Sequence, residues 1–194
     1  MGSERGATIW LTGLPCSGKS SIARLAAAEL QRRGRRVEIL DGDAVREQLS
    51  RGLGFSREDR DTNVQRIAFV AQLLTRHGVI VLVAAISPYA QARSEARARI
   101  GDFIDVHVDC PLAECERRDV KGLYAKARAG TIAAFTGVSD PYEAPTAPEL
   151  VLQTLEHSPE QSARQLLNYL ERQGYVREAE SAAGWVVAGA RISG

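Results

Sequence analysis

One run near the start of the chain constrains the fold more than any other feature. Thr8–Ile22 contains a strand-like stretch, the motif G-x-x-x-x-G-K-S and the start of a helix-like stretch. In that order the motif binds phosphate, because the loop turns its backbone N–H groups toward an anion and the helix adds its positive end. The sequence therefore predicts an ATP or GTP site. Its loop residues are Gly13, Leu14, Pro15, Cys16, Ser17, Gly18, Lys19, Ser20 and Ser21.

Two side chains of this loop carry chemistry. Lys19 is expected to reach the β- and γ-phosphates, and the Ser20 hydroxyl to ligate Mg²⁺. The predicted cofactors are therefore ATP, as co-substrate, and Mg²⁺. A chance match of the motif is the alternative, and the strand and helix on either side of the loop disfavour it.

Strand-like segments alternate with helical ones along the chain, which predicts an α/β fold. The expected strands are Thr8–Thr12, Val37–Leu40, Val79–Ala85, Phe103–Val108 and Leu150–Gln153. Such alternation gives a five-stranded parallel sheet with helices on both faces, and the all-apolar segment 79–85 is expected to be its buried centre. Ligands of these sheets gather at the carboxyl ends of the strands, so the segments after the strands are candidate site residues.

Apolar residues at helical spacing fill the segments between the strands. The expected helices are Ser20–Arg33, one beginning at Ser56, Ala90–Ile100, Pro111–Asp119 and Pro159–Gln173. Gly34 is placed to end the first helix, because glycine tolerates the left-handed conformation that is common there. Ser56, with Asp59 three positions later, is placed to cap the second helix.

Composition limits the classes of partner. The chain has 194 residues, 44% hydrophobic and 25% charged, and a formal net charge of +1. These values predict one soluble globular domain with no general attraction to nucleic acid or membrane. The longest apolar run, Val79–Ile86, is too short to span a bilayer. Three cysteines without a C-x-x-C motif, and a start without an apolar signal-peptide segment, predict a cytoplasmic protein.

The segment 117–148 differs from the rest of the chain, because it is basic and interrupted by Gly and Pro. A long segment of this kind inside a compact domain is typical of a functional lid. A solvated surface excursion is the alternative. We expect one domain over residues 1–176 that includes this lid, followed by a tail, 177–194, whose structure the sequence does not decide.

A site that transfers phosphate needs an acceptor site beside it. Asp43 follows the second predicted strand, where a carboxylate would orient an acceptor hydroxyl, take its proton or hold a water on Mg²⁺. Alternatively, Asp43 caps the helix that follows. Arg46 and Arg60 predict an anionic acceptor, since a guanidinium forks onto phosphate or sulfate oxygens. Phe55, in a loop, is suited to stacking on a base.

Several segments resemble adenylylsulfate kinases, in order from Thr8 to Val176. The matching segments are 13–20, 40–46, 53–63, 86–89, 118–124 and 135–145. The last of them, FTGVSDPYEAP, is more specific than the phosphate loop, which many families share. The resemblance implies a three-layer fold of the P-loop NTPase type. It also implies a kinase of sulfate assimilation that transfers the γ-phosphoryl group of ATP to the 3′-hydroxyl of adenosine 5′-phosphosulfate (APS), giving PAPS and ADP.

The same resemblance implies roles for individual residues. The catalytic candidates are Lys19, Asp43 and Ser87. The substrate-binding candidates are Asp43, Arg46, Phe55, Arg60, Asn63, Ile86, Ser87, Lys121, Gly122, Leu123 and Phe135. Phe55 and Phe135 would sandwich the adenine of APS. Ser87 either forms a phosphoserine intermediate, as the family resemblance suggests, or lines the pocket. Direct in-line transfer is usual for phosphate-loop kinases and favours the second role.

Other functions fit the same residues. One alternative is a kinase for another small acceptor, such as a sugar acid or a nucleoside monophosphate. Another is a nucleotide-binding module of a sulfate-activating complex, although intact Lys19, Ser20 and Asp43 argue against a catalytically silent module. The partners implied are APS, a second copy of the chain in a homodimer, and an ATP sulfurylase.

Overall fold

Five parallel strands form the centre of the molecule. The computed structural model describes residues 5–176, so the tail 177–194 lies outside the described residues. The strands are β1 (Ala7–Thr12), β2 (Val37–Asp41), β3 (Ile80–Ala84), β4 (Phe103–Asp109) and β5 (Leu150–Gln153). They pair in the order β2-β3-β1-β4-β5, and every pair is parallel. The predicted α/β fold with a five-stranded parallel sheet is confirmed.

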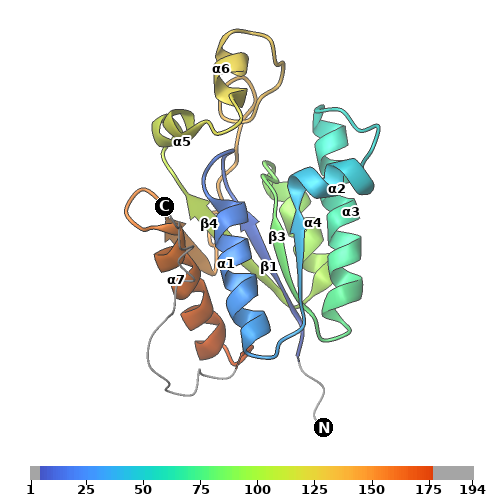
Figure 1. Cartoon of the computed structure of the whole chain (residues 1–194). Coiled ribbons are helices and arrows are strands. Elements are labelled where there is room, and N and C mark those ends of the chain that lie inside the picture. The colour runs from blue at the N-terminus through green and yellow to red at the C-terminus, as the bar shows by residue number, and fades with distance from the viewer. Residues whose placement is uncertain (1–4, 177–194) are drawn as a thin grey trace, which may run out of the picture.

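Helices cover both faces of this sheet. The described residues form the helices α1 (Lys19–Arg32), α2 (Gly42–Gln48), α3 (Arg57–Thr75), α4 (Ala90–Ile100), α5 (Leu112–Arg118), α6 (Leu123–Arg128) and α7 (Pro159–Arg172). Figure 1 shows α1 beside α7 on one face of the sheet, and α3 beside α4 on the other. None of the described helices is long and apolar enough to cross a membrane.

The alternation of side chains along β1 explains these layers. Ile9 and Leu11 lie in the apolar core with α1 and α7, whereas Trp10, between them, lies in the core with α3 and α4. Successive side chains of a strand point to opposite faces, so a strand that is apolar at every position is buried on both. β3 is also buried throughout. However, the central strand is β1, so the prediction that 79–85 forms the centre of the sheet was wrong by one strand.

The two predicted helix ends are confirmed, but two short helices were not among the expected helical segments. Ser56 accepts a hydrogen bond from the backbone N of Asp59 at 3.1 Å, which caps α3. Gly34, with φ of 78°, follows α1 in the left-handed conformation. α2 and α6 have only 7 and 6 residues. Helices this short contain too few turns to show a clear apolar period in the sequence.

The segment predicted as a lid, which contains α6, lies beyond the carboxyl ends of the strands, together with α5 (Figure 1). A separate apolar cluster, which includes Cys115, Tyr124 and Phe135, packs there against Leu14 of the phosphate loop. Gly137 lies so close to this loop that a Cβ on it would be 2.9 Å from Leu14 Cδ2. The segment therefore rests on the phosphate loop, at the edge where parallel sheets place their ligands.

Candidate active site

The phosphate loop, residues 13–20, runs from the end of β1 into the first turn of α1. Gly13 approaches β4 so closely that a Cβ on it would lie 2.5 Å from the carbonyl oxygen of Val108. Gly18 occupies the N-cap of α1 with φ of 104°, a conformation that a side chain would strain. The glycines of the motif therefore allow a close backbone approach and a left-handed turn, and the amino end of α1 points its N–H groups into the loop.

Lys19 is folded back onto its own loop. Its Nζ donates hydrogen bonds to the carbonyl oxygens of Gly13, at 2.9 Å, and Leu14, at 2.6 Å, and lies 3.3 Å from Ser17 Oγ. The side chain is buried, and this burial lowers the pKa of Lys19 to about 8. The ammonium thus lies where the loop would enclose a phosphate, with carbonyl oxygens as its partners.

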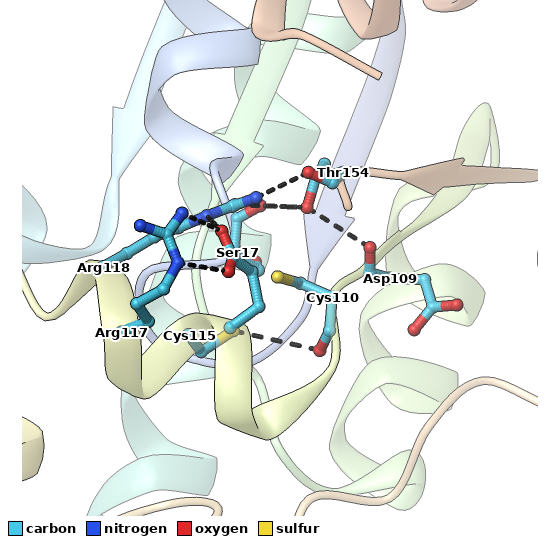
Figure 2. Close-up of polar contacts among 8 residues, drawn as sticks. Ser17, Asp109, Cys110, Cys115, Arg117, Arg118 and Thr154 are labelled. Carbon is cyan, nitrogen blue, oxygen red and sulfur yellow. Dashed lines mark hydrogen bonds and ion pairs between the residues drawn. The ribbon is translucent and has the colours of Figure 1, made fainter. Parts of the chain in front are cut away.

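Thr154, which follows β5, is hydrogen-bonded to the phosphate loop, as Figure 2 shows. Its Oγ1 donates to the carbonyl oxygen of Ser17 at 2.9 Å, and its backbone N donates to the carbonyl oxygen of Asp109 at 2.9 Å. Arg118, at the end of α5, donates to the carbonyl oxygen of Thr154 at 2.5 Å. The sequence reasoning missed Thr154 and Arg118, because no local motif links the end of β5 to a loop 137 positions away.

Asp41 joins the phosphate loop to the next strand end. Ser20 Oγ donates to Asp41 Oδ2 at 2.6 Å. The other carboxylate oxygen of Asp41 accepts the backbone N–H of Asp43 at 3.0 Å, so Asp41 is the N-cap of α2. The alternative in which Asp43 caps this helix is therefore wrong. The Asp43 carboxylate does not cap the helix. It is exposed and forms an ion pair with Lys121 across the site.

The polar oxygens at this edge suit a hard cation that also binds phosphate. Within residues 5–176, no three His, Cys, Asp or Glu side chains are grouped so that they could hold a metal by themselves. Mg²⁺ does not need such a cage, since it is usually held by one or two protein oxygens together with substrate phosphates and water. Ser20 Oγ and the Asp41 carboxylate, 2.6 Å apart, supply oxygens of this kind beside the phosphate loop.

Two arginines surround the ring of Phe55. Arg46 lies with its guanidinium carbon 4.5 Å from the ring centroid and donates to the carbonyl oxygen of Gly54 at 2.9 Å. The guanidinium carbon of Arg60 lies 5.7 Å from the same centroid, and Arg60 Nε donates to the carbonyl oxygen of Phe55 at 2.9 Å. Burial, and then the positive charge of Arg60, lower the pKa of Arg46. Two cations held this close favour an anionic ligand.

Arg60 also reaches the lid segment. Its guanidinium donates to Thr136 Oγ1 at 2.9 Å and to the carbonyl oxygen of Ala134, and lies 3.7 Å from the Asp140 carboxylate. These contacts join the backbone of Phe55 and the segment around Phe135 to one buried guanidinium. The two aromatic candidates, 80 positions apart in the sequence, are thus brought to the same region.

The aromatic candidates have different environments. Phe55 is 56% exposed, whereas Phe135 is buried and meets Tyr124 edge to face, with ring centroids 5.0 Å apart. Tyr124 in turn donates its hydroxyl to the carbonyl oxygen of Pro15 at 3.1 Å. Asn63, one turn of α3 after Arg60, is buried, and its Oδ1 lacks a hydrogen-bond partner among the described residues. A buried unpaired acceptor is costly unless a ligand satisfies it.

Ser87 is buried below this region in a left-handed backbone conformation, with φ of 45°. Its Oγ accepts a hydrogen bond from Trp10 Nε1 at 3.1 Å. The carbonyl oxygen of neighbouring Ile86 accepts one from Thr12 Oγ1 at 2.6 Å. Both residues are thus held by β1. The remaining candidates, Lys121, Gly122 and Leu123, lie at the start of α6, and Lys121 extends from there to Asp43.

Known proteins are similar to this chain in sequence. The family model of adenylylsulphate kinase matches residues 5–153. The adenylyl-sulfate kinase of Gloeothece citriformis is 55% identical over 174 residues, which cover 90% of this chain and 99% of that protein. The adenylyl-sulfate kinase of Halothermothrix orenii is 52% identical over 180 residues, which cover 93% of this chain and 97% of that protein.

Solved structures share the fold. The Mycobacterium tuberculosis APS kinase CysC, in complex with AMPPNP and APS, is similar with a TM-score of 0.83 and 47% identity, covering 86% of this chain and 98% of that chain. A hexameric APS kinase from Thiobacillus denitrificans has a TM-score of 0.68 and 36% identity, covering 90% of this chain and 30% of that chain. A gluconokinase from Sinorhizobium meliloti, at 17% identity and a TM-score of 0.57, covers 88% of this chain and 94% of that chain and shares the fold alone.

Proposed function

The chain belongs to the adenylylsulphate kinase family. We propose that the residues of its site together transfer phosphate from ATP to the 3′-hydroxyl of APS, each in a separate role. The products are PAPS and ADP. Residues 1–176 form the kinase domain, and 117–148 form its lid. The observation that carries this proposal is the position of Asp43, an exposed carboxylate between the phosphate loop and the lid.

The phosphate loop binds the triphosphate of ATP. Lys19 leaves the carbonyl oxygens of Gly13 and Leu14 and binds the β- and γ-phosphates. Its ammonium thereby replaces two carbonyl dipoles with the full negative charge of the phosphates. Ser20 and Asp41 would hold Mg²⁺, which neutralises charge on the phosphates. Thr154 and Arg118 keep the loop in place while the phosphates enter.

The acceptor lies across from the triphosphate, between α3 and the lid. Arg46 and Arg60 bind the phosphosulfate. Both guanidinium groups lie close to the Phe55 ring, where together they can hold one anion. Phe55 and Phe135 enclose the adenine. Asn63 Oδ1, buried and unpaired, accepts a hydrogen bond from the bound acceptor. Ile86, Ser87, Gly122 and Leu123 complete the walls of this pocket.

Asp43 orients the 3′-hydroxyl and accepts its proton as the bond to the γ-phosphoryl group forms. Lys121, which pairs with Asp43, moves to the anionic substrate when the lid closes over it. Closure excludes water, and ATP is thereby protected from hydrolysis. Every one of these steps is consistent with direct transfer, in which positioning and electrostatics supply the catalysis.

Ser87 lines the pocket and does not act as a phosphate carrier. Its hydroxyl is buried and accepts the indole N–H of Trp10, and its backbone is held in an unusual conformation. A serine that received phosphate would have to leave this partner and enter the loop region with a bulky dianion. Retention of turnover by Ser87→Ala would support the pocket role.

The protein is further proposed to be a cytoplasmic enzyme that associates with copies of itself. The hexameric relative supports self-association, and the three cysteines, all free thiols, are typical of a reducing compartment. Analytical ultracentrifugation of the full chain would measure the assembly. Association with an ATP sulfurylase, which makes APS, would be tested by co-sedimentation of the two purified proteins.

A single assay tests the function. ADP release, coupled to a reporter, is measured with Mg·ATP and one of four acceptors: APS, AMP, gluconate or shikimate. We expect turnover with APS and background rates with the other three. Equal or greater turnover with gluconate or AMP would replace the proposed acceptor, and background rates with all four would favour a nucleotide-binding module.

A further inference from the structure

One short stretch of the lid segment, Asp140–Glu143, crosses the carboxyl ends of β1 and β3, and is called the strap here. Tyr142 lies with its hydroxyl 3.1 Å from Thr12 Oγ1 at the end of β1. The Glu143 carboxylate accepts the backbone N–H of Ala90 at 2.7 Å, and thereby caps α4 from 53 positions away. The strap is thus fixed to the sheet and to α4.

The strap shares hydrogen-bond partners with residues 86–88, which are called the floor of the proposed acceptor pocket. Three consecutive carbonyl oxygens of that floor each accept a hydrogen bond. That of Ile86 accepts from Thr12 Oγ1 at 2.6 Å, and that of Pro88 accepts from the backbone N of Glu143 at 2.8 Å. That of Ser87, between them, accepts from Arg93 Nη1 at 2.6 Å. Floor and strap are therefore bound into one unit.

Arg93 is the only described side chain that donates to both parts of this unit. While Nη1 holds Ser87, Nη2 donates to the carbonyl oxygen of Glu143 at 2.5 Å. Its guanidinium carbon lies 5.9 Å from the centroid of the Tyr142 ring, and the side chain is 4% exposed. Burying an arginine whose hydrogen-bond partners are backbone carbonyls is costly. Its position between floor and strap indicates a role beyond filling space.

The other end of the strap contacts Tyr89 and also Arg60, which is proposed to bind the anion. The Asp140 carboxylate accepts the hydroxyl of Tyr89 at 2.9 Å and lies 3.7 Å from Arg60 Nε. Tyr89 directly follows the floor, and the guanidinium carbon of Arg57 lies 4.4 Å from the centroid of the Tyr89 ring. A shift of the strap would therefore displace both the floor and the guanidinium of Arg60.

We propose that Arg93 is a positioning residue. It fixes the shape of the acceptor pocket, because it holds the floor at Ser87 and the strap at Glu143 in one position relative to each other. This inference rests on the proposed acceptor pocket. Ser87 has a positive φ that a non-glycine residue adopts only when its surroundings impose it. The hydrogen bond from Arg93 to its carbonyl oxygen is one such restraint. Loss of Arg93 releases floor and strap together, and the 3′-hydroxyl of the acceptor loses its alignment.

The planar guanidinium of arginine has two donor ends, which makes the conservative variant Arg93→Lys informative. Arg93 reaches two carbonyl oxygens from two nitrogens of one rigid plane, whereas a lysine ammonium would reach one or lie between them. Arg93→Gln removes the fork and the charge, and Arg93→Lys keeps the charge alone. Arg97, one turn later on α4, is a matched control. It pairs with Glu149 at 2.7 Å and lies over Phe103, away from the strap.

The experiment compares three variants with the wild type by calorimetry and steady-state kinetics. Arg93→Gln is expected to weaken APS binding and lower kcat, by about 10²-fold together in kcat/KM for APS, because small misplacements of a reacting group cost that much. Arg93→Lys should lose less. Binding of AMPPNP should change less than about twofold in both. Arg97→Gln should keep wild-type kcat/KM, even if its thermal midpoint falls as far as that of Arg93→Gln.

A reference variant separates this inference from the proposed pocket. Phe55→Ala should weaken APS binding if the pocket lies where it is proposed. If Phe55→Ala weakens APS binding while Arg93→Gln and Arg97→Gln lose activity equally, Arg93 is merely structural. If Phe55→Ala binds APS normally, the pocket assignment fails, and the role of Arg93 fails with it. Should Arg93→Gln not fold, equal kinetics of Arg93→Lys and wild type would overturn the inference.

Discussion

Lys121 and Asp43 form an ion pair across the site, although 78 positions separate them in the sequence. Lys121 belongs to the lid segment, just before α6, and Asp43 lies in the first turn of α2. Both side chains are largely exposed, so the pair adds little to stability. The hydrogen bond to Asp43 raises the pKa of Lys121, which keeps its ammonium charged. The pair therefore marks where the proposed lid and the proposed base meet.

Asp43→Asn tests the chemistry of that base. Asparagine keeps the shape and one acceptor oxygen but removes the charge and the basicity. We expect kcat to fall by roughly 10²–10⁴-fold, the range for loss of a general base. Binding of ATP and APS should stay within a few-fold, because the carboxylate acts mainly in the transition state. Single-turnover rates and calorimetry on the same variant measure both effects.

The fold should not respond to this substitution, because Asp41 and not Asp43 caps α2. Glu47→Gln, on an exposed position of the same helix, is the matched control and should keep full activity. A near wild-type rate for Asp43→Asn would remove Asp43 from the mechanism. A large drop in its thermal midpoint would point instead to a structural role.

Lys19→Ala should abolish most of the phosphoryl transfer while the protein stays folded. The ammonium is expected to stabilise charge on the transferring phosphoryl group, and losing it should cost about 10³-fold in kcat. Lys126→Ala, which removes an exposed lysine of α6, serves as the control. Circular dichroism and turnover are measured for both variants. Comparable turnover in the two would show that Lys19 has no part in transfer.

The buried position of Lys19 also predicts a proton uptake. Since its pKa is lowered from 10.5 to about 8, the folded state binds this proton less tightly than the unfolded state. The cost of burying the charge is thus complete below pH 8 and is relieved as the pH rises toward 10.5. Phosphates restore the charge, so ATP binding at pH 9 should take up a proton. Calorimetry in two buffers of different ionisation enthalpy measures it, and Lys19→Arg should show none.

Arg60→Ala should damage APS binding more than ATP binding. The guanidinium is buried between Phe55 and Thr136, and truncation removes a charged contact from a desolvated anion, a loss of about 2 kcal/mol or more. Arg66→Ala is the control, because Arg66 lies on the same helix and donates to the carbonyl oxygen of Leu49 instead. Calorimetry with APS and AMPPNP measures both affinities. Equal losses for the two ligands would contradict the proposed division of the site.

Cys16 should be the thiol that a maleimide reagent labels in the native protein. It lies half-buried in the phosphate loop, whereas Cys110 and Cys115 are buried, and burial raises the pKa of Cys115 to about 12. A thiol kept protonated reacts slowly. Mg·ATP should protect Cys16, and Cys16→Ser should abolish the labelling. An unchanged labelling rate with saturating nucleotide would place the phosphates elsewhere.

The local parts of this protein could be predicted from its sequence. The phosphate loop, the five strands and the Ser56 cap each depend on residues within a few positions of one another, so their patterns are readable along the chain. Lys19, Ser20 and Asp43 could be placed at the carboxyl edge of the sheet for the same reason, because parallel strands all end there. The resemblance of several segments to adenylylsulfate kinases then indicated the substrate.

The contacts among these parts could not be predicted. Lys19 turns back onto carbonyl oxygens, and Arg60 joins α3 to residues 134–140. Arg93 by itself links the backbone of Ser87 to that of Glu143. Such hydrogen bonds form only when packing has brought distant backbone groups together and has removed the water that would otherwise satisfy them. The sequence alone determined the strands, the longer helices and their order along the chain, and the tertiary structure decided which polar groups each element would find as partners.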